Sequence, residues 1–336
     1  MSRLLLRARL FVVLARPPLL LLLAMSGALG AASAGAALGL GPALVAFAVV
    51  VPCLVYAVSL NDLVDVRVDR INLPDDPSRP LARGAAAMRD AVAVAGFAAV
   101  LALALAAWVG ATALVVTATG LLVATAYSVP PVALNRRGVL GPLLLPLCLL
   151  AVPFAVGVDA AGGTWGATQV ALLAALYAGF VGRLLVKDFR DVRGDALLGK
   201  RTFLVRRGRR ATCALSAVLW VLGSAALLAV PDRSWPLVLC WTALVALAVG
   251  VLVALAQPST HRRDERLVSA LAILGRALVL LLLLHLALVQ QASSPLRSAA
   301  LLGAVSTALA LSALHVARYG APGRVLALPA AERARR

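Results

Sequence analysis

Residues 42 to 69 read PALVAFAVVVPCLVYAVSLNDLVDVRVD, an apolar run that passes directly into a cluster of aspartates. A run of about 20 apolar residues is the length that an α-helix needs to cross a hydrocarbon layer of roughly 30 Å. The stretch therefore predicts a membrane-spanning helix whose last turn, and the turn that follows it, carry acidic side chains.

Similar apolar runs recur along the whole chain. Of its 336 residues, 62% are hydrophobic, whereas soluble globular domains have roughly 45 to 50%. This composition excludes an ordinary cytosolic enzyme and predicts an all-α fold, a polytopic transmembrane helical bundle. We expect ten segments, near residues 17 to 35, 42 to 62, 86 to 108, 110 to 127, 139 to 158, 166 to 186, 211 to 229, 235 to 256, 267 to 289 and 297 to 317.

The charges of the chain orient this bundle. There are 32 basic and 14 acidic residues, a net charge of +18, and most of the basic residues fall on alternate connections between segments. This positive-inside asymmetry predicts that both termini are cytoplasmic, in a multi-pass protein of the plasma (inner) membrane. Basic and aromatic residues are not interleaved as a nucleic-acid surface would require, so we expect no nucleic-acid partner.

One transmembrane domain accounts for most of the chain. We expect it to span residues 17 to 317, after a cytoplasmic N-terminal segment of residues 1 to 16. Residues 318 to 336 are rich in Ala and Arg and are predicted to form a disordered cytoplasmic tail.

Two acidic clusters stand out in this acid-poor chain. Residues 61 to 69 read NDLVDVRVD and residues 187 to 195 read KDFRDVRGD, so both contain the string D-x-x-D-V-R-x-D. In each copy the aspartates are spaced i, i+3 and i+7, which places them on one stripe of an α-helix. The C-terminal end of a helix carries partial negative charge, so acids at that end require compensating cations. The six acids are Asp62, Asp65, Asp69, Asp188, Asp191 and Asp195.

Two interpretations of these clusters are open. Hard carboxylate oxygens suit Mg²⁺, which bridges readily to substrate phosphates, so two facing stripes would form a diphosphate clamp. Alternatively, the acids are solvated loop residues paired with Arg67, Arg70, Arg190 and Arg193. The repetition of one pattern at two equivalent helix ends favours the clamp. The two helices would then meet around a central cavity, open to the cytoplasmic side, that fits a charged head and a hydrocarbon tail.

A proline-rich stretch follows the first cluster. Residues 72 to 84 read NLPDDPSRPLARG, and their prolines and glycine forbid a continuous helix, which predicts an ordered cytoplasmic loop. Arg70, Arg79 and Arg83 are candidates for binding phosphate oxygens, because the planar guanidinium is suited to them; their alternative role is as positive-inside anchors. Residues 199 to 208 are predicted to form a second loop of the same character.

In these residues the chain resembles the UbiA superfamily of intramembrane prenyltransferases. The two clusters are similar to the NDxxDxxxD and DxxDxxxD patterns of that family, and residues 69 to 84 resemble its DR-x-N…RPL…G signature. Arg16-Pro17, Tyr127-Ser128 and residues 202 to 208 are similar to further family landmarks. Family members usually have nine membrane helices, so the resemblance implies a bundle of nine or ten here, with residues 297 to 317 as the additional one.

The resemblance also implies a reaction. Mg²⁺ would bridge both motifs to a prenyl diphosphate donor, and the allylic carbocation left by ionisation would be captured by a hydrophobic or aromatic acceptor among the membrane lipids. The metal would be held by all six aspartates, with Asp65 and Asp191 as the catalytic pair. The diphosphate would be contacted by Asn61, Arg70, Arg79 and Lys187. A basic residue that often follows the tyrosine of the fourth helix is replaced here by Pro131.

Other functions remain open at this point. The same scaffold could transfer a phosphoribosyl group to a polyprenyl phosphate or cyclise an isoprenoid. A lipid or ion transporter could also present ten helices with charged ends, although transporters usually place their site near the bilayer midplane. Arg183 and Arg276 lie inside apolar segments, where charge is costly, which indicates a partner or a role at a cavity.

Overall fold

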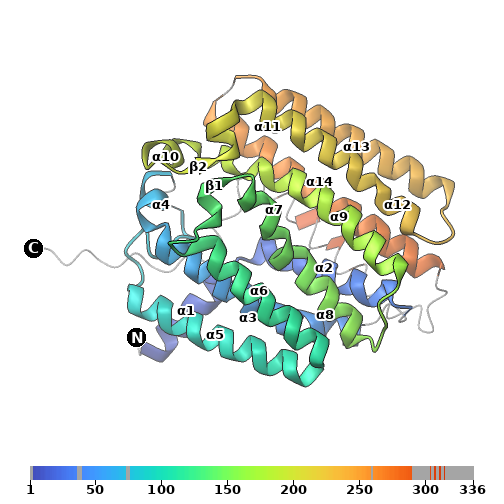
Figure 1. The fold of residues 1–336 in the computed structure, drawn as a ribbon, viewed down its shortest axis with the longest axis horizontal. Coiled ribbons are helices and arrows are strands. Elements are labelled where there is room, and N and C mark those ends of the chain that lie inside the picture. The colour runs from blue at the N-terminus through green and yellow to red at the C-terminus, as the bar shows by residue number, and fades with distance from the viewer. Residues whose placement is uncertain are drawn as a thin grey trace, which may run out of the picture.

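The computed structural model describes residues 3–35, 40–72, 76–258 and 260–289, together with single positions between 303 and 314. The chain is a bundle of long helices with one short parallel strand pair (Figure 1). The elements are α1 (Arg3–Leu14), α2 (Pro17–Ser33), α3 (Leu40–Val64), α4 (Val66–Asn72), α5 (Met88–Val109), α6 (Ala111–Ser128), η1 (Leu134–Arg136), β1 (Arg137–Gly138), α7 (Leu140–Pro146), the π-helix η2 (Leu147–Ala151), α8 (Val152–Ala160), α9 (Ala167–Leu185), η3 (Lys187–Phe189), α10 (Val192–Leu197), β2 (Arg201–Thr202), α11 (Phe203–Leu222), η4 (Gly223–Ala225), α12 (Ala226–Ala229), α13 (Trp235–Ala256) and α14 (His261–Val289).

The helices are long enough to cross a membrane. Eight spans in the described residues have the required length and hydropathy, or nine if α1 and α2 form one bent span. Many of their apolar side chains point outward, such as Phe97 and Trp108 on α5, and a hydrocarbon layer is the environment that suits such a surface. The predicted all-α, polytopic membrane bundle is therefore confirmed. The predicted tenth segment, residues 297 to 317, lies almost wholly outside the described residues, and the tail of residues 318 to 336 lies entirely outside them.

Two helices begin earlier than the apolar pattern predicts. A helical turn begins at Phe203 and breaks at Gly208 (φ 76°), after which the seventh segment continues close to its predicted start at residue 211, and the ninth segment starts at His261 rather than near residue 267. The added turns are charged, and Arg209 on one of them forms two hydrogen bonds of 2.8 and 2.7 Å with Asp264 on the other. The prediction that residues 199 to 208 form a loop is therefore wrong for residues 203 to 207, which are helical up to the break at Gly208; Thr202 caps this turn by accepting from the backbone N–H of Val205.

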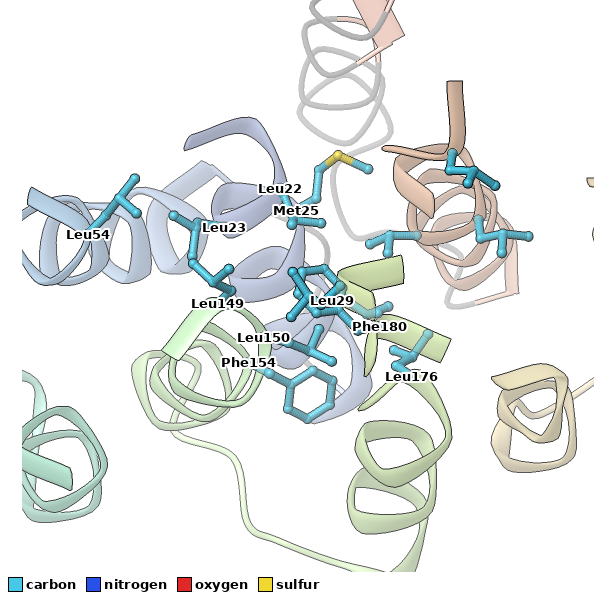
Figure 2. Close-up of a cluster of buried hydrophobic side chains, with 14 of the residues drawn as sticks. Leu22, Leu23, Met25, Leu29, Leu54, Leu149, Leu150, Phe154, Leu176 and Phe180 are labelled. Atoms are coloured by element: carbon cyan, nitrogen blue, oxygen red, sulfur yellow. The ribbon is translucent and has the colours of Figure 1, made fainter. Parts of the chain in front are cut away.

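Helix α2 lies at the centre of the bundle and crosses α8 closely. A Cβ on Gly30 would overlap the backbone carbonyl of Phe154, and one on Gly157 would overlap the carbonyl of Gly27. Small residues at such crossings let helix backbones touch, which is a usual way for membrane helices to associate. The leucines of α2 form the centre of the hydrophobic core (Figure 2).

Two small apolar cavities lie between helices of the bundle. The first is lined from α2, α3, α6, η2 and α8, with Leu54, Leu121 and Leu149 among its walls. The second is lined from η2, α9, α11, η4, α13 and α14. Residues of η2 contribute to both, since Leu149 borders the first cavity and Leu150 the second. Figure 2 shows these two side chains beside α2, which also borders the first cavity through Leu23.

Candidate active site

Both aspartate motifs lie at breaks in their helices. Helix α3 ends at Val64 and α4 begins at Val66, whereas α9 ends at Leu185 and is followed by η3 and then α10. The continuous helical stripe expected from the spacing is thus interrupted at the middle aspartate of each motif. Helical hydrogen bonds nevertheless continue across Asp65, whose backbone N–H donates to Asn61 and whose carbonyl accepts from Asp69, both at 2.8 Å. The carboxylates therefore keep approximately the register of one helical face.

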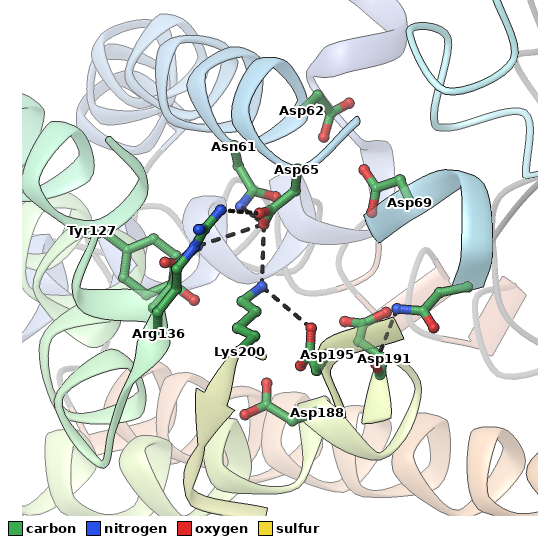
Figure 3. Close-up of polar contacts among 12 residues, drawn as sticks. Asn61, Asp62, Asp65, Asp69, Tyr127, Arg136, Asp188, Asp191, Asp195 and Lys200 are labelled. Atoms are coloured by element: carbon green, nitrogen blue, oxygen red, sulfur yellow. Dashed lines mark hydrogen bonds and ion pairs between the residues drawn. The ribbon is translucent and has the colours of Figure 1, made fainter. Parts of the chain in front are cut away.

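The two motifs face each other at one end of the bundle (Figure 3). Helix α4 contacts α10 there, and β1 pairs in parallel with β2 to join two of the loops at this end (Figure 1). Asn72 holds the motifs together: its amide donates to the carbonyl of Asp191 at 2.9 Å and accepts from the N–H of Gly194 at 2.7 Å. A Cβ on Gly194 would lie 2.7 Å from the Asn72 amide, so this approach requires glycine.

The acids of the motifs are buried rather than solvated. Asp62 and Asp195 are each 1% exposed. Of the six acids only Asp191 is half-buried, and the other five are buried. Among the described residues, none of the four arginines considered as loop partners forms an ion pair with these acids; they are Arg67, Arg70, Arg190 and Arg193. The alternative of solvated, locally paired loop acids is therefore wrong.

Arginines neutralise the first motif. Arg79 forms ion pairs with Asp62 and, at 3.1 Å, with Asp69. Arg16, from the junction of α1 and α2, reaches the same oxygen of Asp62 at 2.6 Å. Burial nevertheless raises the pKa of Asp69 to about 7, against the opposing effect of Arg79. This carboxylate therefore lies in surroundings that favour a further cation.

Lysines neutralise the second motif. The ammonium of Lys200 lies between the motifs, 3.2 Å from an oxygen of Asp65 and 3.5 Å from one of Asp195. Lys187 lies 3.4 Å from Asp188 and donates to the hydroxyl of Tyr127 at 2.9 Å. Burial raises the pKa of Asp195 to about 7 despite the positive charge of Lys200.

Sequence reasoning did not assign Lys200 to the site. The composition could have indicated Lys200 as a site residue, because Lys187 and Lys200 are the only lysines among the 32 basic residues. Asn135 was also missed; its amide donates to Asp65 at 3.5 Å. No sequence motif marks Asn135, and only the fold brings η1 beside α3.

The remaining predicted residues lie around Asp65 or at the edge of the site. Asn61 donates to Asp65 at 3.0 Å, and Arg136 lies 3.9 Å from the other oxygen of the same carboxylate. Arg70 is exposed and donates to the backbone carbonyl of Ala82 at 3.3 Å. Arg79 and Lys187 thus contact acids of the motifs, whereas Arg70 holds the following loop.

The donor set of the site suits a hard divalent cation. Among the described residues, four aspartate oxygens are buried without a hydrogen bond. Two of them lie near a basic group, Asp195 Oδ1 at 3.5 Å from Lys200 and Asp65 Oδ1 at 3.9 Å from Arg136, whereas Asp62 Oδ2 and Asp191 Oδ1 form no ion pair either. Buried carboxylate oxygens are costly unless they bind a cation or a donor, and oxygen ligands are those that Mg²⁺ prefers. Within the described residues, no group of three acidic, histidine or cysteine side chains is close enough to hold a metal ion together. The basic side chains of Arg79 and Lys200 lie between the aspartates instead, as Figure 3 shows for Lys200.

The fold and the site define an intramembrane helical-bundle enzyme. The chain belongs to the UbiA prenyltransferase family, whose model matches residues 19–276. It is 37% identical over 247 residues to a digeranylgeranylglyceryl phosphate synthase of Halobacterium salinarum, which covers 72% of this chain and 84% of that protein. It is 32% identical over 160 residues to the bacteriochlorophyll synthase 33 kDa chain of Cereibacter sphaeroides, covering 47% of this chain and 52% of that protein.

Solved structures show the same fold. A UbiA homologue from Archaeoglobus fulgidus bound to GPP and Mg²⁺ superposes with a TM-score of 0.58 at 17% identity, over 83% of this chain and 99% of that one. A structure of digeranylgeranylglyceryl phosphate synthase superposes with a TM-score of 0.59 at 21% identity, over 84% of this chain and 99% of that one. The protein is an integral membrane prenyltransferase, which decides against the transporter alternative.

Proposed function

We propose that the protein uses Mg²⁺ to transfer an isoprenyl group from a prenyl diphosphate to an aromatic or lipid-like acceptor, between the two aspartate motifs. The observation that carries this proposal is the pair of facing, buried motifs, in which Asp62 Oδ2 and Asp191 Oδ1 have neither a hydrogen bond nor an ion pair with another described residue. Small apolar cavities lie in the same bundle. The solved homologues bound to GPP or DMAPP with Mg²⁺ support the choice of ligands.

The acids of both motifs are the proposed metal ligands. They are Asp62, Asp65, Asp69, Asp188, Asp191 and Asp195, with Asp65 and Asp191 at the two helix breaks as the catalytic pair. Bound Mg²⁺ supplies positive charge that stabilises the departing diphosphate. Because each middle aspartate follows a helix break, its carboxylate can face the opposite motif rather than only its own helix.

Basic and amide side chains around the acids are the proposed diphosphate contacts. Arg79, Lys187 and Asn61 lie within hydrogen-bond or ion-pair distance of motif acids, so they border the space between the motifs. Arg70 lies at its outer edge. Preorganised positive groups stabilise charge on a leaving diphosphate without reorganisation during the reaction. Exclusion of water by the surrounding apolar helices would protect a carbocation until the acceptor captures it.

The site end of the bundle is the proposed cytoplasmic end. Arg67, Arg70, Arg136, Arg193 and Arg201 are exposed at this end, in agreement with the positive-inside rule. The same rule supports cytoplasmic termini and an orientation in the plasma (inner) membrane. Helix α14 begins beside the site, where Ser269 contacts Arg190, and ends at Val289 at the opposite end of the bundle. A reporter fused after residue 289 and active only in the cytoplasm should therefore be inactive in this orientation and active in the reversed one.

Substitution of the middle aspartates tests the proposed chemistry. We expect Asp65→Asn and Asp191→Asn to abolish pyrophosphate release from prenyl diphosphates in the presence of Mg²⁺ and host lipid extract, because each removes a charged metal ligand. Asp232→Asn, on an exposed residue outside both motifs, is the matched control and should keep full activity. Mass spectrometry identifies the prenylated product. Wild-type turnover in either motif variant would contradict the proposal.

A further inference from the structure

Two arginines lie side by side on the strand pair at the site end of the bundle (Figure 1). Strands β1 and β2 run in parallel, and Arg137 is the partner of Arg201 across the pair. Both residues are exposed, whereas the residues that follow them, Gly138 and Thr202, are buried. Partners in register point to the same face, and neighbouring strands lie about 4.8 Å apart. Two guanidinium groups therefore extend from one face of the pair.

A third arginine packs against the same pair. Arg206 lies near the start of α11, and its Nη1 is 3.2 Å from the position that a Cβ on Gly138 would take, so its guanidinium lies against β1. Arg137 is fixed by donating to the backbone carbonyl of Pro131 at 2.8 Å. We call Arg137, Arg201 and Arg206 the strand-pair arginines. They come from both strands and from the helix that follows β2.

The protein does not neutralise these charges. None of the strand-pair arginines forms an ion pair with another described residue. Of the acidic residues that the structure describes, only Asp232 is exposed, and it lies past the far end of α11. The part of α11 after Gly208 alone rises about 20 Å, which is beyond the range of unscreened attraction in salt solution. Because adjacent like charges on paired strands are destabilising, the strand-pair arginines favour an anion from outside the chain.

The strand pair lies at the boundary of two membrane spans. Strand β1 ends two residues before the span Leu140–Ala160, and β2 ends directly before the span Phe203–Ala229. Apolar side chains are exposed beside the arginines, namely Val139 and Leu140 after β1 and Val205 on α11. Basic side chains at the ends of membrane spans lie at the level of the lipid headgroups. An anion at this depth is one that is attached to an apolar chain.

We propose that the strand-pair arginines form a second phosphate-binding site, outside the aspartate motifs, for the phosphate headgroup of a membrane amphiphile. The planar guanidinium matches phosphate oxygens, and the exposed apolar residues beside the pair suit the attached chain. Two amphiphiles carry this chemistry: an anionic phospholipid of the bilayer, and a prenyl diphosphate that has not yet reached the motifs. Arg136, which precedes β1 and lies 3.9 Å from Asp65, connects this surface to the motifs. Only the second source rests on the proposed prenyl transfer.

Native mass spectrometry in neutral detergent without Mg²⁺ tests the site independently of turnover. The probe is a long-chain alkyl phosphate, compared with the matched alcohol and with inorganic phosphate. We expect the double variant Arg201→Gln with Arg206→Gln to bind the alkyl phosphate about tenfold or more weakly than the wild type, as for loss of hydrogen bonds to a charged group. Its Tm without probe should not fall, because like-charge repulsion is removed. Arg89→Gln is the matched control, since Arg89 is also exposed at the start of a span, Met88–Val109, and should bind as the wild type does.

Two further measurements identify the source of the phosphate. If the site binds bilayer phospholipid, the wild type should bind phosphatidylglycerol about tenfold more tightly than the double variant does, with phosphatidylcholine bound equally by both. If it binds the donor, the double variant should raise KM for a prenyl diphosphate about tenfold and leave kcat unchanged. If the wild type released no pyrophosphate from any donor, prenyl transfer would fail, and the phosphatidylglycerol comparison would still decide this site.

Several outcomes would overturn the inference. Equal binding of the alkyl phosphate by the double variant and by Arg89→Gln would remove the site. A large drop in the Tm of the double variant would show that the strand-pair arginines are structural. The alcohol or inorganic phosphate binding as tightly as the alkyl phosphate would exclude an amphiphile with a phosphate headgroup. A change in neither phosphatidylglycerol binding nor donor KM would do the same.

Discussion

The two aspartate motifs share one string of residues but differ in the positive charges that surround them. At the first motif, the guanidinium groups of Arg16 and Arg79 converge on Asp62 from two separate connections. At the second motif the compensating groups are the ammonium groups of Lys187 and Lys200. A planar guanidinium holds a carboxylate in a fixed geometry, whereas an ammonium is a compact charge on a flexible stem.

This difference indicates that the two motifs have different roles. The first is fixed in place by rigid ion pairs that come from distant parts of the chain. The second is neutralised by ammonium groups, and that of Lys200 also bonds to Asp65 of the first motif. Repetition of a motif therefore does not imply equivalent roles, and substitutions at the two motifs are expected to have different effects.

The largest effect is expected at the first motif. Arg79→Gln leaves Asp62 and Asp69, both buried, with less compensating charge, and loss of one partner from a buried pair costs about 3 to 5 kcal/mol. Thermal unfolding in detergent should show a large drop in Tm. Arg83→Gln in the same loop is the control and should shift the Tm little. A similar shift in both variants would show that Arg79 has no special role in holding the motif.

A smaller effect is expected at the second motif. Lys200→Gln should destabilise the protein by about 1 to 3 kcal/mol, the range for hydrogen bonds to charged groups. The same substitution should strengthen Mn²⁺ binding about tenfold, because it removes a positive charge that lies 3.2 Å from Asp65 and 3.5 Å from Asp195. Titration followed by electron paramagnetic resonance measures free Mn²⁺. Lys200→Arg keeps the charge and should bind Mn²⁺ as the wild type does.

Mn²⁺ binding to Lys200→Gln no tighter than to the wild type would contradict the claim that the charge of Lys200 opposes cation binding between the motifs. Lys200 would then be a structural link between the motifs and not a competitor for cations.

The smallest effect concerns the junction between the motifs. Asn72→Ala removes two hydrogen bonds, and Gly194→Ala places a methyl group where the Asn72 amide lies. Each should cost about 1 to 2 kcal/mol, and the double variant should cost less than their sum, because both break one contact. Gly96→Ala, on an exposed helical face with open space at the Cβ, is the control. Additive Tm shifts would show that Asn72 and Gly194 are not coupled.

Hydropathy predicted the apolar parts of the helices but not their charged turns. Residues 203 to 210 and 261 to 266 are rich in arginine, so an apolar pattern treats them as connections. Apart from the break at Gly208 they are helical, because Thr202 caps one helix and because Arg209 pairs with Asp264 on the other. The boundary thus depends on a contact between residues that are distant in the sequence.

The aspartates were predictable, whereas most of their partners were not. Spacing of i, i+3 and i+7 survives a helix break as long as the helical hydrogen bonds continue, as they do at Asp65. Arg16 lies 46 residues from Asp62 and Asn135 lies 70 residues from Asp65, and only tertiary structure brings such pairs together. The solvated-acid alternative was wrong for the same reason: burial of the motifs comes from the surrounding helices.

The positions of the two lysines make the protein suited to selective chemistry. Lys187 and Lys200 carry the only side-chain amines of the chain, and both belong to the proposed site. An acylating reagent that reacts with amines can therefore modify this protein only at the site and at the N-terminal amine. Protection of these two lysines by a bound prenyl diphosphate, read by peptide mass mapping, would report occupancy without isotopic substrate or introduced labels.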